Sequence, residues 1–91
     1  MLFIVCRVID CTHITLMKSN MSNFNIRKKF GKRVRFLRNL IKLSQEELGF
    51  KSDIHRTYIG AVERGEQNIS LDNIYKLSKA LKVSIKDLFE F

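Results

Sequence analysis

Apolar residues at helical intervals constrain the fold of this chain more than any other feature of its sequence. Four of them, separated by steps of four, three and four residues, are Phe30, Val34, Leu37 and Ile41. This spacing places them on one face of a helix, which we predict to run from about Ile26 to Leu43. The 91 residues include four glycines and no proline, so helices joined by short turns are favoured over a turn-rich β-fold.

Capping residues divide the next part of the chain into short helices. Ser44 and Glu47 have the spacing of a capping box, which predicts a second helix that ends at about Lys51. A third helix is predicted from His55 to Arg64, because Gly65 is the residue type best suited to a left-handed C-terminal cap.

Two further helices are predicted near the C-terminus. Ser70 is a suitable N-cap for a fourth helix. The apolar residues of this helix, spaced by three and four, are Ile74, Leu77 and Leu81. Ser84 and Asp87 can cap a short fifth helix. We therefore predict an all-α fold, a compact five-helix bundle without an internal repeat.

The charge of the chain indicates a polyanionic partner. It has 17 Lys and Arg against 9 Asp and Glu, a net charge of +8. Eight of the basic residues fall within one segment that contains no acid: Arg27, Lys28, Lys29, Lys32, Arg33, Arg35, Arg38 and Lys42. A helix face that is merely solvated would show both signs interspersed. Nucleic acid and an anionic membrane surface are both candidates, and no stretch approaches the roughly 18 apolar residues of a membrane span.

The second and third predicted helices meet the requirements of a helix-turn-helix. They are short, a turn of three or four residues joins them, and Gln45 opens the first of them. In this motif the second helix lies in the DNA major groove and the helix crossing behind it needs small residues. Gly49 and Gly60 fit that crossing, and each costs about 1 kcal/mol relative to alanine inside a helix. The pair therefore predicts a close approach of two backbones.

Four segments carry a resemblance to a known family. They are Ser44-Gln45-Glu46-Glu47-Leu48, Arg56-Thr57-Tyr58-Ile59, Val62-Glu63-Arg64-Gly65-Glu66 and Asn68-Ile69-Ser70-Leu71. Over about residues 26–90 the chain resembles the Cro/C1-type (XRE) helix-turn-helix family, which implies a bundle of the lambda-repressor-like DNA-binding type. The string His55 to Ile59 with Glu63-Arg64-Gly65 resembles in particular the controller proteins of restriction-modification systems. Gly49 departs from the alanine that is common there.

The first residues have no counterpart in that family. We expect residues 1–22 to be a leader, either flexible or omitted when translation starts at Met21, and residues 23–91 to be the helix-turn-helix DNA-binding domain. The leader lacks the charged n-region and the full h-region of a signal peptide, so a cytoplasmic location is expected.

Neither cysteines nor histidines suggest a chemical site. Cys6 and Cys11 lie near His13 but no second ligand pair occurs, so we expect free thiols and no metal. His13 and His55 have no serine or acid at catalytic spacing, and no enzyme is predicted.

The resemblance implies which residues read the bases. It places Arg56, Thr57 and Tyr58 at the start of the recognition helix. An arginine there can bind guanine O6 and N7 through two hydrogen bonds. The alternative for Arg56 is a solvated surface charge without a role in DNA binding. Tyr58 can contact the backbone or thymine methyl groups, or pack against the second helix.

Contacts to the sugar-phosphate backbone are implied for Gln45, Arg64 and Asn68. Ordinary N-terminal capping is the alternative for Gln45. Glu63 differs from these residues because an acid beside DNA is more plausible as a structural group. We therefore expect it to pair with an arginine of the first helix, either Arg38 or Arg35.

Taken together, the resemblance implies a transcriptional regulator that binds a palindromic double-stranded DNA operator as a homodimer, without a cofactor or small-molecule ligand. Autoregulation and control of restriction-modification genes are expected. The residues that either form the dimer surface or complete the core are Tyr75, Val83, Ile85, Phe89 and Phe91. The alternatives are an antitoxin-like or phage-type repressor whose main partner is another protein, and a basic domain on a membrane surface.

Overall fold

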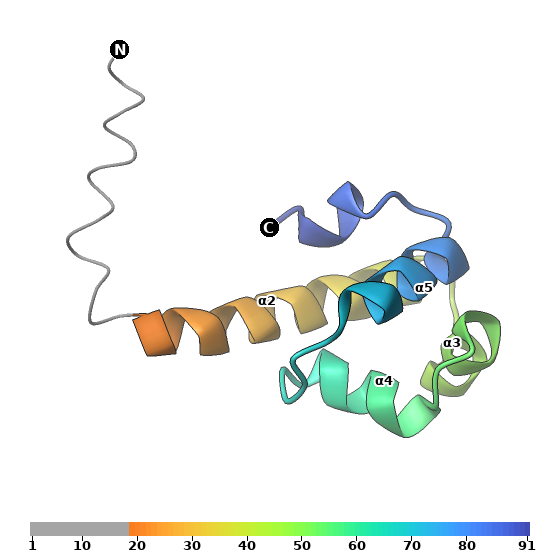
Figure 1. Cartoon of the computed structure of the whole chain (residues 1–91). Coiled ribbons are helices and arrows are strands. Elements are labelled where there is room, and N and C mark those ends of the chain that lie inside the picture. Colours follow the sequence, from red (N-terminus) through yellow and green to blue (C-terminus); the bar gives the residue numbers. More distant parts are fainter. Residues whose placement is uncertain (1–18) are drawn as a thin grey trace, which may run out of the picture.

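The computed structural model describes residues 19–91, which form a small all-helical bundle. Its elements are α2 (Ser19–Leu40), α3 (Gln45–Ser52), α4 (Arg56–Glu63), α5 (Leu71–Leu81) and the 3₁₀ helix η1 (Lys86–Phe89). Figure 1 shows α2 as the long axis, with α4 packed on one side of it and η1 on the other, while α3 contacts both α4 and α5. The all-α prediction is confirmed. The predicted fifth helix is a single 3₁₀ turn, so the described residues hold four α-helices rather than five.

All four α-helices and η1 contribute side chains to the core. Its buried side chains include Phe30, Val34, Leu37, Leu48, Ile59, Val62, Leu77, Leu81 and Leu88. The predicted apolar face of the first helix is therefore correct except at Ile41, which is 43% exposed. Ile41 misses the core because α2 ends at Leu40 and the chain turns away immediately afterwards.

A residue in the left-handed conformation lies one or two positions beyond each α-helix, and three of these residues are not glycine. Lys42, Asp53 and Lys82 have φ of 58°, 61° and 62°, and Gly65 has φ of 79°. At the end of α2 the N–H of Leu43 donates to the carbonyl of Arg38 at 3.1 Å, as in a Schellman motif. This turn stops α2 three residues before the predicted end at Leu43.

The starts of the helices follow the predicted caps. Ser44 Oγ accepts the N–H of Glu47 at 2.9 Å, and Glu47 Oε1 accepts the N–H of Ser44 at 2.8 Å, so the capping box is confirmed. Ser70 Oγ accepts the N–H of Asn73 at 3.2 Å. The first helix instead begins at Ser19, before the predicted Ile26, because no proline or glycine interrupts that segment. Residues 1–18 of the predicted leader lie outside the described residues.

At Gly31 and Gly49 the absence of a Cβ lets a carbonyl group of another segment approach closely. A Cβ on Gly49 would lie 2.6 Å from the carbonyl oxygen of Ile54, so close approach is confirmed there. The same prediction for Gly60 is wrong, because its nearest neighbours are side-chain ends. The tightest contact is at Gly31, which the pattern did not reveal. A Cβ there would meet the carbonyl oxygen of Val62 and lie 2.7 Å from that of Glu63.

We therefore expect Gly31→Ala to lower the free energy of unfolding by about 1–3 kcal/mol, because the C-terminal end of α4 must move away from α2. Gly60→Ala is the matched control. It adds the same methyl group to a helix but meets only flexible side-chain ends 3.2 Å away. Urea denaturation followed by circular dichroism measures both, and equal stability of the two variants would contradict the close contact at Gly31.

Candidate nucleic-acid interface

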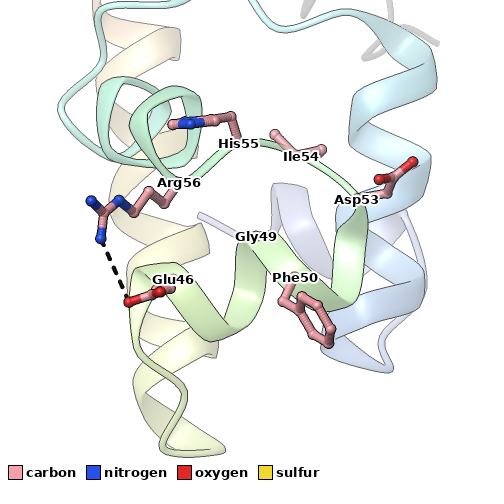
Figure 2. Close-up of a pocket in the computed structure, with 7 residues that line it drawn as sticks. All are labelled: Glu46, Gly49, Phe50, Asp53, Ile54, His55 and Arg56. Atoms are coloured by element: carbon pink, nitrogen blue, oxygen red, sulfur yellow. Dashed lines mark ion pairs between the residues drawn. The ribbon is translucent and has the colours of Figure 1, made fainter.

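Helices α3 and α4 and the turn between them form a helix-turn-helix. Asp53 takes the left-handed conformation at the end of α3, and the N–H of Ile54 then donates to the carbonyl of Gly49 at 3.0 Å. Ile54 is buried, which anchors the turn on the core. His55 follows and is the N-cap of α4. Figure 2 shows this turn above an open hollow of about 510 Å³ between α3 and the start of α4.

The residues predicted to read bases lie together at the start of α4. Arg56 and Thr57 are exposed, whereas Tyr58 is half-buried and packs against the hydrophobic core. The guanidinium of Arg56 lies 3.5 Å from a carboxylate oxygen of Glu46 on α3 (Figure 2). Both side chains are largely exposed, so an incoming hydrogen-bond acceptor can reach Arg56.

Two of the residues predicted to contact the DNA backbone meet over Gly60. Gln45 Oε1 and Arg64 Nη1 each lie 3.2 Å from the position that a Cβ of Gly60 would occupy. The missing side chain therefore leaves the space that these two polar groups share. Asn68 is exposed in the loop between α4 and α5 and lines a different, smaller hollow beside Arg27.

Glu63 forms a buried ion pair with Arg38, so this prediction is confirmed and the alternative Arg35 is excluded. Arg38 Nε donates to Glu63 Oε2 at 2.6 Å, and Nη2 donates to Oε1 at 2.9 Å. The side chains are only 10% and 2% exposed. Hydrogen bonding to the carboxylate raises the pKa of Arg38 above its ordinary value, against the opposing effect of burial. The pair joins α2 to α4.

The same carboxylate also holds α3, which sequence reasoning missed. Gln45 Nε2 donates to Glu63 Oε1 at 3.0 Å, and Arg38 Nη1 donates to the carbonyl of Leu43 at 2.8 Å. Gln45 therefore has a structural hydrogen bond in addition to any contact with DNA. Its spacing from Glu63 along the chain gives no hint of this bond.

The basic segment of α2 does not form one uniform surface. Arg38 is buried in its pair with Glu63, and Arg33 Nε donates to the carbonyl of Asp87 at 2.8 Å, which ties η1 to α2. Both arginines therefore serve the fold. Other members of the segment remain exposed: Lys28, Lys29, Lys32, Arg35 and Lys42.

Arg64 pairs with Glu66 just beyond α4. Its Nε and Nη2 donate to the Glu66 carboxylate at 2.9 and 3.1 Å. These hydrogen bonds raise the pKa of Arg64 and lower the pKa of Glu66. Nη1 takes no part in this pair and points to the space over Gly60.

Within residues 19–91, no helix has both the length and the apolar character needed to cross a membrane. In the same part of the chain, His, Cys, Asp and Glu side chains do not gather in threes as a metal site would need. Cys6, Cys11 and His13 lie outside the described residues.

A comparison with protein families agrees with this geometry. The family HTH_3, described as helix-turn-helix, matches residues 34–88, which hold the end of α2 and all the elements that follow as far as Leu88. The chain belongs to this family. The predicted resemblance to Cro/C1-type proteins is thereby confirmed.

Within this family, the chain is similar to several control proteins. The control protein C.BamHI of Bacillus amyloliquefaciens is 56% identical over 68 residues, which cover 74% of this chain and 84% of that protein. The control protein C.SmaI of Serratia marcescens is 45% identical over 64 residues, 70% of this chain and 76% of that protein. Among solved structures, the restriction-modification controller protein C.AhdI of Aeromonas hydrophila aligns with a TM-score of 0.69 and 51% identity. That alignment covers 69% of this chain and 96% of C.AhdI.

We expect Glu63→Gln to lower the free energy of unfolding by about 3 kcal/mol, because it leaves Arg38 as a buried charge without its counter-ion. Thermal and urea denaturation provide the measurement. Glu66→Gln is the control, since it neutralises an acid that pairs with an arginine at the surface. Its melting temperature should match that of the parent protein, and a similar loss in both variants would count against a special role for Glu63.

Proposed function

We propose that this protein is a sequence-specific DNA-binding transcriptional regulator that controls restriction-modification genes, its own gene included. The observation that carries the proposal is the exposed start of α4, held by a buried ion pair between Arg38 and Glu63, in a chain similar to control proteins. A recognition helix must present polar side chains to base edges while its other face stays fixed. Helix α4 meets both demands, because Arg56 and Thr57 are exposed and Ile59 is buried.

We assign base contacts to Arg56, Thr57 and Tyr58. The exposed ion pair between Arg56 and Glu46 supports this role. Such pairs contribute at most about 1 kcal/mol to stability, so Arg56 can leave Glu46 and form hydrogen bonds with a guanine edge at little cost in free energy. Tyr58 also packs on the core, so we expect it to reach DNA only with the outer part of its ring.

We assign backbone contacts to Gln45, Arg64 and Asn68. The Gln45 amide lies beside Arg64 Nη1 over Gly60, and its Nε2 keeps a second N–H besides the one donated to Glu63, which favours one phosphate held by both residues. Asn68 lies in the loop after α4, and we assign it to a neighbouring phosphate. These contacts fix the position of α4 on the duplex without reading its sequence.

The proposed active form is a homodimer on a palindromic operator, with recognition helices about 34 Å apart. Its support is apolar surface that the monomer leaves uncovered near the C-terminus. Tyr75, Ile85, Phe89 and Phe91 are 52%, 37%, 42% and 54% exposed. Val83 is half-buried against the core and has less surface to offer a partner. Such a regulator acts in the cytoplasm and needs no cofactor or small-molecule ligand.

The decisive experiment is a gel shift with the DNA just upstream of the gene, in the presence of excess random-sequence competitor and over a range of salt concentrations. A discrete complex on a two-fold-symmetric site is the expected result. A salt-sensitive smear alone would overturn sequence-specific binding and favour an antitoxin-like or phage-type repressor whose main partner is a protein.

Two arginine variants separate base reading from phosphate binding. Arg56→Ala should weaken binding to the cognate site by about 1–3 kcal/mol and leave random DNA almost unaffected. Arg64→Ala should weaken both, and should reduce the slope of log affinity against log salt by about one. Equal losses on both DNAs for Arg56→Ala, or an unchanged slope for Arg64→Ala, would refute the respective assignment.

The dimer surface is tested by the double variant Tyr75→Glu/Ile85→Glu. We expect it to shift the protein to monomers in sedimentation equilibrium and to abolish the discrete DNA complex, because two like charges would face each other across a symmetric interface. Phe50→Glu is the control for sedimentation equilibrium alone, since Phe50 is 89% exposed on α3, outside the proposed dimer interface, but lines the same hollow as Arg56. A double variant that remained dimeric would place the interface elsewhere.

A further inference from the structure

One residue, His55, satisfies three of the first N–H groups of α4. Its Nδ1 accepts the N–H of Thr57 at 3.0 Å. Its carbonyl accepts the N–H groups of Tyr58 at 3.0 Å and Ile59 at 3.1 Å. The carbonyl bonds would form with any residue at this position, so the N–H of Thr57 is the group that depends on the His55 side chain.

The hydrogen bond from Thr57 requires an Nδ1 without a proton, because a ring nitrogen can accept a hydrogen bond only when it carries no proton. The other two helices with caps in the described residues use hydroxyl groups instead. Ser44 caps α3 and Ser70 caps α5, and neither group changes its charge near neutral pH. Imidazole changes its charge between about pH 5 and 8.

We propose that His55 is a positioning residue that makes sequence-specific DNA recognition depend on pH. This inference rests on the proposed function. Neutral His55 holds the start of α4, and with it Arg56 and Thr57, in the orientation that meets base edges. Protonation removes the acceptor and puts a positive charge at the positive end of the helix dipole, so the first turn of α4 loosens.

The charged groups that line the hollow with His55 come from three places. They are Glu46 on α3, Asp53 in the turn and Arg56 at the start of α4 (Figure 2). DNA phosphates would also attract a charged imidazole, which strengthens binding to any sequence. The ratio of specific to non-specific affinity therefore isolates the effect of the cap, because the extra charge raises both affinities while only the specific one needs an ordered α4.

The test measures that ratio between pH 8 and pH 5.5 at constant ionic strength, with the upstream DNA fragment and a random duplex of equal length. For the parent protein we expect the ratio to fall about five-fold towards pH 5.5, the effect of losing one helix cap. His55→Ser provides a cap that does not titrate in this range, so its ratio should stay constant. His55→Ala should show a reduced ratio at every pH.

Two further measurements separate the cap from other effects of pH. His13→Gln removes the other histidine of the chain and should keep the parent profile. The NMR signal of the Thr57 amide should titrate together with the His55 ring in the parent protein and stay unchanged in His55→Ser. A discrete complex with the same pH profile in the parent and in His55→Ser would overturn this inference alone. If no variant forms a discrete complex at any pH, the proposed function fails and this inference fails with it.

Discussion

The buried ion pair between Arg38 and Glu63 is the interaction on which the rest of the structure depends. A carboxylate that is 2% exposed is stable only when its oxygens are fully hydrogen-bonded, and Arg38 and Gln45 together supply that bonding. These partners lie on α2, α3 and α4, so one acid fixes the mutual position of three helices. Arg38 also binds the carbonyl of Leu43, which holds the turn between α2 and α3. The polar centre thus aligns the two helices of the motif before any DNA is present.

Three glycines, which have no side chain, allow the helices to pack in this arrangement. Gly31 lets the C-terminal end of α4 rest on α2, and Gly49 lets the turn before α4 rest on α3. Gly60 works differently, because it makes room for the polar ends of Gln45 and Arg64 rather than for a backbone. In the basic segment of α2, Arg33 and Arg38 stabilise the fold, whereas other basic residues are exposed at the surface.

Local rules predicted most of the helices, because caps and apolar spacing act over a few residues. The capping box at Ser44 and the left-handed Gly65 are of this kind, and both are confirmed. The left-handed Lys42 was not predictable, because the turn it makes is stabilised by the partly buried Leu43, which packs against the core and accepts a hydrogen bond from Arg38. The close contact at Gly31 and the bond from Gln45 to Glu63 also join residues distant in sequence. The predicted site residues were found through the resemblance, and the structure shows how Arg56 and Thr57 come to lie at one exposed helix start.

By itself the sequence determined the all-helical class, the limits of α3 and α4 and the start of α5 to within a residue or two, and the need for a partner to Glu63. Each of these follows from spacing, charge or side-chain type along a short stretch, whereas the helix-turn-helix family was inferred from a resemblance. Only the tertiary structure decided that this partner is Arg38 and not Arg35, that Ile41 faces solvent, and that the His55 ring caps α4. The physical reason is that the partner of a buried charge, the face of a helix that packs and the acceptor of a cap are each determined by the atoms that surround them in space. Neighbours in sequence supply few of those atoms.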